Sequence, residues 1–170
     1  MTNYPRHIAA FPYQGEYRYS ITICTDQRHQ AFTNPDVVSL VREQLLRASG
    51  DAAIAILAYC FMPDHLHLVL EGRSEQADLK QFVNRAKQYS GYRYARAHGG
   101  RKLWQRYCFE HVLRDNESTQ RIVRYVLENP VRKGLVNHPR DYPYLGSSEY
   151  TLHELLEFAY SVSGSEYRAG

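Results

Sequence analysis

Two histidines lie one residue apart, directly after a segment typical of a turn. His65 and His67 follow Phe-Met-Pro-Asp and enclose Leu66. Side chains at i and i+2 of a strand emerge on the same face, so both imidazoles could converge on one metal ion while Leu66 points into the core. Two imidazoles are an incomplete ligand set, so this chemistry needs a further ligand. The alternative is a pair of half-exposed surface histidines.

A second candidate group follows helical spacing. Ile122, Tyr125, Val126 and Asn129 stand at i, i+3, i+4 and i+7, which share one helix face. Burial of Ile122 and Val126 against a sheet would bring the Tyr125 hydroxyl and the Asn129 amide to the same side. A phenol and an amide could then face the histidine strand together. The alternative is a core tyrosine and an asparagine that caps the helix.

Other two-histidine chemistries fit the sequence less well. Val69 stands where a histidine-triad hydrolase would carry its third histidine, and two separate His-x-Thr or His-x-Ser motifs, as in two-histidine phosphodiesterases, are not evident. A zinc hydrolase would need a third protein ligand. No ligand-like spacing is found among the other histidines, which are His7, His29, His98, His111, His138 and His153.

A basic segment rich in aromatic residues lies between the two candidate groups. Lys80 to Arg106 contains eight cations and neither Asp nor Glu, although the whole chain has a net charge of only +3. Cations can contact phosphates, and aromatic rings can stack on unpaired bases, so we predict a nucleic-acid surface. A solvated helix face over packed tyrosines is the alternative. The predicted contacts are Arg85, Lys87, Tyr89, Arg93, Arg96, Arg101, Lys102, Trp104 and Arg106.

The elements that must position these residues follow from periodicity and turn signals. Alternation predicts a strand over 16–25, and Asn34-Pro35 begins a helix that Gly50-Asp51 ends. Two strands over 53–60 and 65–71, joined by a turn at 62–64, form a hairpin with the histidines on its returning arm.

The second half of the chain continues this alternation of strands and helices. Ser74 caps a helix over 75–97, which Gly91 bends or interrupts, and a strand follows over 103–113. Asp115 or Asn116 caps a helix that ends at Asn129-Pro130. A helix over 151–161 follows, and about eight final residues look disordered. The order predicts an α+β fold, an antiparallel sheet with helices packed on its faces.

Composition sets the class of protein. The 170 residues suit a single domain, with 44% hydrophobic and 23% charged residues as in ordinary globular proteins. No apolar run approaches the roughly 18 residues of a membrane helix, and no secretory signal is seen at the N-terminus. Cys24, Cys60 and Cys108 are odd in number and far apart, as expected of thiols in a cytoplasmic protein.

The motifs around both candidate groups resemble those of a known family. His65-Leu66-His67 after Phe-Met-Pro-Asp is similar to the His-hydrophobe-His motif of single-tyrosine HUH transposases, the insertion-sequence 200-like group. Blocks at 103–107, 109–115 and above all 125–135 resemble its branch of REP-associated tyrosine transposases, in which REP denotes a repetitive extragenic palindrome. The resemblance covers about residues 17–148.

The resemblance implies an HUH endonuclease fold, which is a ferredoxin-like or RRM-like α/β sandwich. It implies that Tyr125 attacks single-stranded DNA to give a 5′-phosphotyrosine and a free 3′-hydroxyl, and that the reverse reaction rejoins strands without ATP. The implied cofactor is a divalent metal, Mg²⁺ or Mn²⁺, on His65, His67 and Asn129. Many relatives carry Gln at the last position, and the shorter amide would need a water or a shifted helix to reach the metal.

The implied partner is single-stranded DNA with a palindromic-repeat hairpin, and the resemblance adds Arg132 to the DNA-binding residues. Residues 3–6 are a candidate reader of the unpaired flank. Monomer and homodimer both remain open, as does an active site within one subunit or across two. One rival is a hairpin-binding protein that no longer cuts, although no motif residue is lost here. The other is a small-molecule metallohydrolase, which would need acidic ligands and a neutral surface.

Overall fold

The computed structural model describes residues 11–113 and 116–161, and it shows an α+β sandwich as the sequence predicts. All neighbouring strands of its five-stranded sheet are antiparallel, in the order β4-β1-β3-β2-β5. The strands are β1 (Arg18–Thr25), β2 (Ile54–Met62), β3 (His65–Gly72), β4 (Trp104–Leu113) and β5 (Leu145–Gly146). Short 3-10 helices span Asp26–Arg28, Ala31–Thr33 and Pro139–Asp141.

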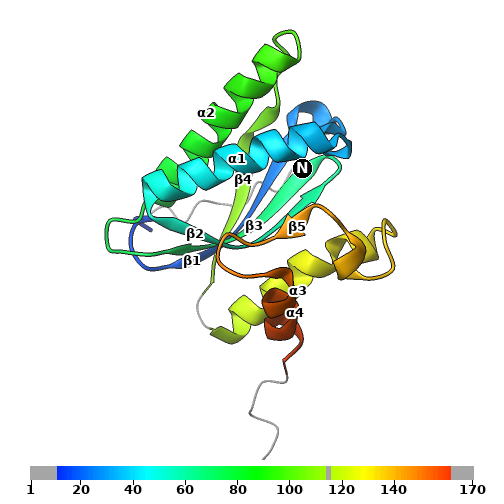
Figure 1. Ribbon diagram of the computed structural model, residues 1–170. Helices are drawn as coiled ribbons and strands as arrows, with labels where there is room; N and C mark the ends of the chain where they lie inside the picture. The colour runs from blue at the N-terminus through cyan, green and yellow to red at the C-terminus, as the bar shows by residue number, and fades with distance from the viewer. Residues whose placement is uncertain (1–10, 114–115, 162–170) are drawn as a thin grey trace, which may run out of the picture.

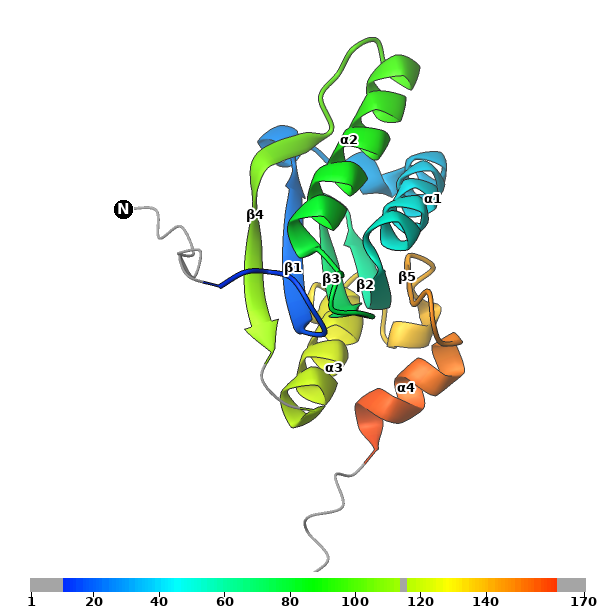
Figure 2. The same cartoon turned by 90° about the vertical axis from the view of Figure 1, so that its left-hand side faces the viewer.

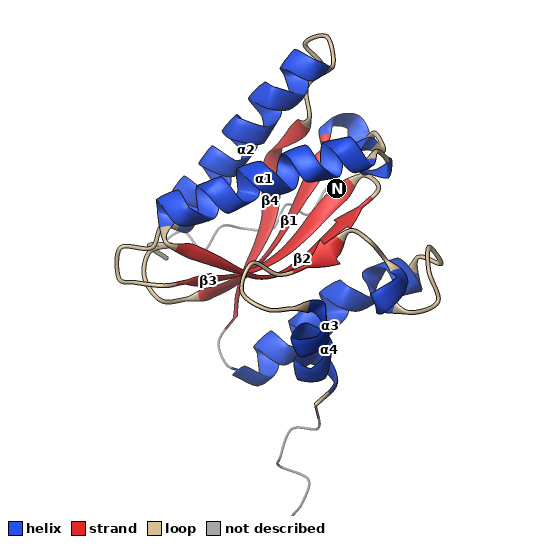
Figure 3. Cartoon of the chain, in the orientation of Figure 1, coloured by secondary structure: helices blue, strands red, loops and turns tan. Residues whose placement is uncertain are grey.

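Helices cover both faces of the sheet (Figure 1). We call the face under α1 (Pro35–Ala52) and α2 (Leu79–Ala97) the upper face, and the face over α3 (Asn116–Arg132) and α4 (Leu152–Tyr160) the lower face. The two pairs of helices lie on opposite sides of the strands (Figure 3). Each face has its own hydrophobic core. Elements on one face are therefore separated from those on the other by the thickness of the sheet.

Strand β3 shows how the sheet directs the histidines. Leu66, Leu68 and Leu70 are fully buried in the upper core, whereas Val69 belongs to the lower core. Because side chains alternate along a strand, His65 and His67 lie on the lower face with Val69. The predicted β2–β3 hairpin is confirmed, with Met62 opposite His65 across the turn.

Helix α1 begins at the predicted place but ends later. The Asn34 side chain accepts a hydrogen bond from the Asp36 N–H, so the predicted cap is confirmed. The predicted end at Gly50-Asp51 is wrong, because the helix continues to Ala52 and stops where Ala53 adopts a φ of 53°. Packing of α1 on α2 and β2 outweighs the low helix propensity of the glycine.

Helix α2 begins later than predicted and is continuous. Asp78, not Ser74, caps it by accepting a hydrogen bond from the Gln81 N–H. Gly91 neither breaks nor ends the helix, and a Cβ at this position would lie 3.7 Å from the Trp104 side chain. The glycine therefore lies where the helix packs closely on β4.

Helix α3 continues through Asn129-Pro130 to Arg132, so the predicted end before the proline is wrong. A proline removes one backbone N–H, but this helix packs on β2 and β3 and buries Val126 and Leu127. The turn closes after the proline, where the Leu135 N–H donates to the Pro130 carbonyl. Asn129 is thus inside the helix, and its side chain is buried instead of capping an end.

The C-terminal region adds a strand that the sequence did not predict. Strand β5 pairs with Tyr59 and Cys60 of β2 and completes the sheet edge. The predicted last helix is α4, which Thr151 and Glu154 cap reciprocally. The predicted cap Asp115, the flank reader at 3–6 and the tail after residue 161 lie outside the described residues. Among the described helices, none has the length and apolar character needed to cross a membrane.

Candidate active site on the lower face of the sheet

The two imidazoles converge on one point. His65 Nε2 and His67 Nε2 are 3.1 Å apart, with the rings nearly perpendicular at 87°. Both side chains are only partly exposed and project from adjacent lower-face positions of β3. The sequence prediction that the pair shares a face is therefore confirmed.

Each histidine is held on its other nitrogen by a neighbouring side chain. His65 Nδ1 lies 2.6 Å from Asp64 Oδ1, and Arg28 contacts the other oxygen of that carboxylate at 2.8 Å. His67 Nδ1 lies 2.9 Å from Thr22 Oγ1 on β1. Such outer partners fix the tautomer and the orientation of metal-binding imidazoles.

These contacts orient both rings of the pair. Burial would raise the pKa of Asp64, but the hydrogen bond from His65 and the charge of Arg28 together hold it below its ordinary value. His65 Nδ1 therefore donates to a carboxylate, and its Nε2 is directed toward His67. A hydroxyl both donates and accepts, so Thr22 suits either tautomer of His67. A proton on His67 Nε2 would make the 3.1 Å contact a hydrogen bond to His65 Nε2, and a metal ion held by both nitrogens would replace that proton.

Burial also keeps His67 neutral. Burial first, and then the nearby charges of His65, Arg132 and Arg28, lower the pKa of His67 to about 4. At neutral pH this imidazole is therefore uncharged, which is the form that binds a metal ion.

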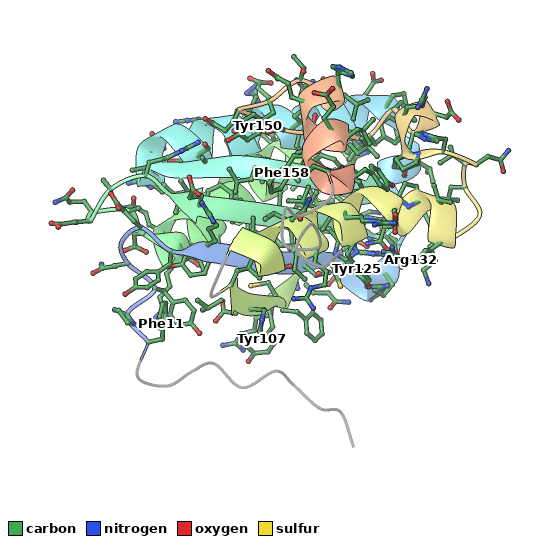
Figure 4. The ribbon with its side chains drawn as sticks, turned by 90° about the horizontal axis from the view of Figure 1, so that it is seen from below. Phe11, Tyr107, Tyr125, Arg132, Tyr150 and Phe158 are labelled. Carbon is green, nitrogen blue, oxygen red and sulfur yellow. The ribbon has the colours of Figure 1, made fainter. Side chains whose placement is uncertain are left out.

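Tyr125 lies beside the histidine pair within the same chain. Its ring centroid is 6.4 Å from that of His67, and 51% of the residue is exposed, so the phenol is accessible from solvent. The Arg132 guanidinium lies 4.0 Å from the Tyr125 ring centroid, and it also contacts Glu128 at 3.5 Å. Figure 4 shows Tyr125 and Arg132 on α3, seen from below the sheet. The chain thus places a tyrosine, a cation and two imidazoles together on the lower face.

Asn129 is the third residue of the predicted metal site. It is buried at 5% exposure on α3, and its amide nitrogen has no hydrogen-bond partner among the described residues. Nitrogen and oxygen of an amide are assigned from hydrogen bonding, so the unsatisfied end of this side chain is a polar group that lacks a ligand. Two imidazoles and an amide form a mixed set that fits a divalent ion with open positions. Within the described part of the chain, no cluster of three or more His, Cys, Asp or Glu could hold a metal ion, so the amide matters to this set.

The structure places most of the predicted nucleic-acid residues on the opposite face. Arg93, Arg96 and Tyr89 of α2 line a groove of about 630 Å³ between α1 and α2, on the upper face. Arg47 of α1 joins them and stacks on the Tyr89 ring at 4.2 Å. This groove is separated from Tyr125 by the sheet.

The other predicted contacts have varied surroundings. Arg85 and Lys102 face carboxylates, those of Asp51 at 3.5 Å and Asp26 at 3.3 Å. Arg106 lies over the exposed Tyr107 ring at 5.4 Å. Arg101 is exposed in the loop before β4.

Two predicted DNA contacts are engaged in the fold. Trp104 is buried, and its indole N–H donates to the Ser90 hydroxyl, so its ring offers no stacking surface. Lys87 donates to the carbonyls of Gln105 and Arg106, and burial lowers its pKa. Both residues join α2 to β4, so their role is in the fold and the proposed DNA surface does not include them.

Sequence reasoning missed the residues that orient the histidines. Thr22 is a polar lower-face residue of a strand that was predicted, but its partner depends on the pairing of β1 with β3, in which Thr22 lies opposite His67. Asp64 was assigned only to the turn. Its place next to His65 was the available signal for a carboxylate–histidine pair.

This chain belongs to a transposase family. Residues 13–129 match the family described as Transposase IS200 like. This range includes both histidines, Tyr125 and Asn129. Transposases are enzymes, so the chain belongs to an enzyme class.

The similar proteins come from one branch of that family. A Haemophilus influenzae protein provisionally named a REP-associated tyrosine transposase is 24% identical over 138 residues, which are 74% of this chain and 77% of the relative. The REP-associated tyrosine transposase of Escherichia coli K12 is 24% identical over 105 residues, 62% of this chain and 61% of that protein. A solved REP-associated tyrosine transposase bound to a REP hairpin has the same fold, with a TM-score of 0.72, 21% identity, and coverage of 100% of this chain and 97% of that one.

Proposed function

We propose that this chain is a metal-dependent endonuclease and strand transferase that cuts and rejoins single-stranded DNA at palindromic-repeat hairpins. The observation that carries the proposal is the close approach of His67 to Tyr125, at 6.4 Å between ring centroids, next to converging imidazoles. Membership of a transposase family and the hairpin bound by the structural neighbour support the DNA substrate.

In the proposed reaction Tyr125 is the nucleophile. Its oxygen forms a bond to the phosphorus as the bond from phosphorus to the 3′-oxygen breaks, and the departing oxygen takes up a proton to become a 3′-hydroxyl. The DNA then carries a 5′-phosphotyrosine, so the number of phosphodiester bonds is conserved. Attack by a second 3′-hydroxyl reverses these steps and joins a new strand.

A phenol with an ordinary pKa near 10 is a weak nucleophile at neutral pH, so its surroundings must supply assistance. His65, His67 and Asn129 would hold Mg²⁺ or Mn²⁺, which polarises the scissile phosphate when bound. Arg132 lies over the Tyr125 ring and can neutralise charge that develops at the phenol and the phosphate. Asp64 and Thr22 keep the imidazole lone pairs directed to the same point.

We further propose that the upper groove between α1 and α2 contacts the DNA backbone of the hairpin. Arg47, Arg93 and Arg96 line the groove with Tyr89 and Tyr92. Glu43 contacts Arg93 at 3.9 Å, a distance at which an exposed pair is weak and readily exchanged for phosphate. The unpaired strand would then reach Tyr125 on the other face of the sheet.

The test is a cleavage and rejoining assay on a hairpin oligonucleotide with an unpaired flank, in the presence of Mn²⁺. We expect site-specific cleavage and transfer to an added 3′-hydroxyl strand, and loss of both in Tyr125→Phe. Tyr107→Phe, at another exposed lower tyrosine, is the matched control and should stay active. A hairpin-binding protein that no longer cuts would bind this DNA without producing fragments, and cleavage that persists in chelator would exclude the metal.

A further inference from the structure

Among the described residues, helix cover on the lower face of the sheet is limited to the half formed by β2 and β3. Helix α3 packs on β2 and β3, and Figure 2 shows β4 at the edge of the sheet, beyond β1. On the upper side of β1, Tyr19, Ile21 and Ile23 are each 1% exposed. On its lower side Ser20 and Thr22 remain partly exposed. The fold therefore leaves a shallow polar floor over β1 and β4, next to the candidate site.

The register of the sheet connects this floor directly to the histidine pair. Thr22 lies opposite His67 of β3 on one side and opposite Phe109 of β4 on the other. Residues paired across antiparallel strands point to the same face, at about 5 Å per step. Phe109, Thr22 and His67 thus form one row across the lower face, and His67 contacts Tyr125 at its end.

The strand at the end of this row presents its aromatic side chain outward. Phe109 is 45% exposed, although Cys108 and Val112, its neighbours on the opposite side of β4, pack on the upper core. Ser20 and His111 pair next to Thr22 and Phe109, and Ser20 is partly exposed whereas His111 is exposed. A phenylalanine that keeps nearly half of its surface exposed on a sheet face matches the aromatic platforms on which sheets stack unpaired bases.

Charge on both sides of the row suits a nucleic-acid strand. Arg106 lies over the ring of Tyr107 on β4, and Arg132 lies over the ring of Tyr125 on α3. Figure 4 shows Tyr107 at the outer edge of β4 and Tyr125 on α3 in the same view from below. Glu110 of β4 pairs with Ile21, so it belongs to the upper side of the strand.

We infer that the open floor formed by Ser20, Thr22, Phe109 and His111 binds unpaired nucleobases next to the scissile phosphate, with one base stacked on Phe109. The inference rests on the proposed function for the position of the phosphate. The hydroxyls of Ser20 and Thr22 leave room for a flat base above the strand. The site recognises a base as a π surface, so it accepts different sequences.

The experiment compares binding of a 20-nucleotide oligothymidylate with binding of an abasic strand that has the same length and charge. We expect Phe109→Ala to weaken binding of the oligothymidylate by about five- to hundredfold and to leave the abasic strand unaffected. Phe109→Trp should retain the affinity, and Phe109→Leu, which keeps apolar bulk without a π face, should lose it. Tyr150→Ala, an equally exposed aromatic residue near α4, is the control and should bind as the parent does.

Each other outcome overturns the inference. Unchanged oligothymidylate binding in Phe109→Ala would show that no base stacks on Phe109. An equal loss of affinity for the abasic strand would mean that Phe109→Ala acts through charge or folding. If Phe109→Ala and the parent protein differ in sedimentation coefficient without DNA, this face is a contact between copies of the chain. Covalent attachment of DNA to the parent protein is measured separately and tests the proposed reaction. The affinity for oligothymidylate tests stacking on Phe109, so each proposal can fail without the other.

Discussion

At the scale of single residues, the site depends on the groups behind the histidines as much as on the histidines themselves. Thr22 and Asp64 each hold an Nδ1 atom, and this leaves the two Nε2 atoms directed at one another. The unsatisfied amide of Asn129 lies on the adjoining helix. A side chain that holds a histidine without touching the proposed metal can therefore affect the affinity for that metal.

Thr22→Val tests this role, because it keeps the shape of the side chain and removes the hydroxyl. We expect the affinity for Mn²⁺, measured by isothermal titration calorimetry, to fall about 10- to 100-fold. Ser20→Ala removes a hydroxyl from the next lower-face position of the same strand and should leave Mn²⁺ binding unchanged. Equal affinities for Thr22→Val and the parent protein would contradict the assignment of Thr22 as an outer partner.

The lowered pKa of His67 also predicts a dependence of stability on pH. The unfolded chain binds a proton on this histidine below about pH 6.5, whereas the folded chain binds it only near pH 4. The free energy of unfolding should therefore fall as the pH falls through this window. Between pH 7 and pH 5 we expect a loss of about 2 kcal/mol that His67→Gln lacks. Urea denaturation in chelator measures it, and parallel curves for both proteins would contradict the shift.

At the scale of elements, the sequence predicted what periodicity and turn chemistry encode. The β2–β3 hairpin and the Asn34 cap follow from local pattern, and both are confirmed. One helix carries both Tyr125 and Asn129, but Tyr125 is half exposed whereas Asn129 is buried. The position of α3 against β3 does not follow from local pattern, because it depends on packing between segments about sixty residues apart in the sequence. The motif resemblance supplied that link, and the structure supplies the distance.

The errors occurred where packing outweighed a local breaker. Gly50, Gly91 and Pro130 all lie inside helices. The continuation past Pro130 matters most, because Asn129 is then a buried residue inside the helix and not an end cap. The free-energy cost of one unfavourable residue in a helix is small compared with the free energy gained by burying a helix face. Tertiary contacts therefore decided where these three helices end.

A pair of glycine substitutions tests these boundaries. Gly91→Ala should raise the free energy of unfolding by about 0.5–1 kcal/mol, because the helix is continuous and a Cβ there makes an ordinary contact with Trp104. Gly134→Ala should lower it by about 1 kcal/mol or more, because φ is +69° where α3 ends. Urea denaturation gives both values. A destabilised Gly91→Ala protein would indicate a break in α2.

At the scale of the whole molecule, the sheet divides the proposed functions between two faces. The groove with Arg47, Arg93 and Arg96 lies above the sheet, whereas Tyr125 and the histidines lie below it. The nucleic-acid surface was predicted from the cations and aromatic residues of one segment, and this composition does not indicate which face of a sheet a helix covers. Tyr125 and the two histidines of the candidate site lie together within one chain.

This division predicts that binding and chemistry can be separated. Replacing both Arg93 and Arg96 by alanine should weaken hairpin binding and flatten its log-log salt dependence by about one unit per lost phosphate contact. Cleavage at saturating DNA should keep its rate, because Tyr125 is on the other face. A double alanine variant of Arg42 and Arg140, two exposed arginines outside the groove, is the control. An unchanged salt dependence would place the hairpin on another surface.

The most direct test of the account is to identify the residue that carries the DNA. A hairpin oligonucleotide labelled at its 3′ end is incubated with the protein and Mn²⁺, and the denatured adduct is digested and sequenced by mass spectrometry. Because attack leaves a 5′-phosphotyrosine, the label should remain with the peptide that contains Tyr125. An adduct on another tyrosine, such as Tyr107, or cleavage without any adduct would contradict the account.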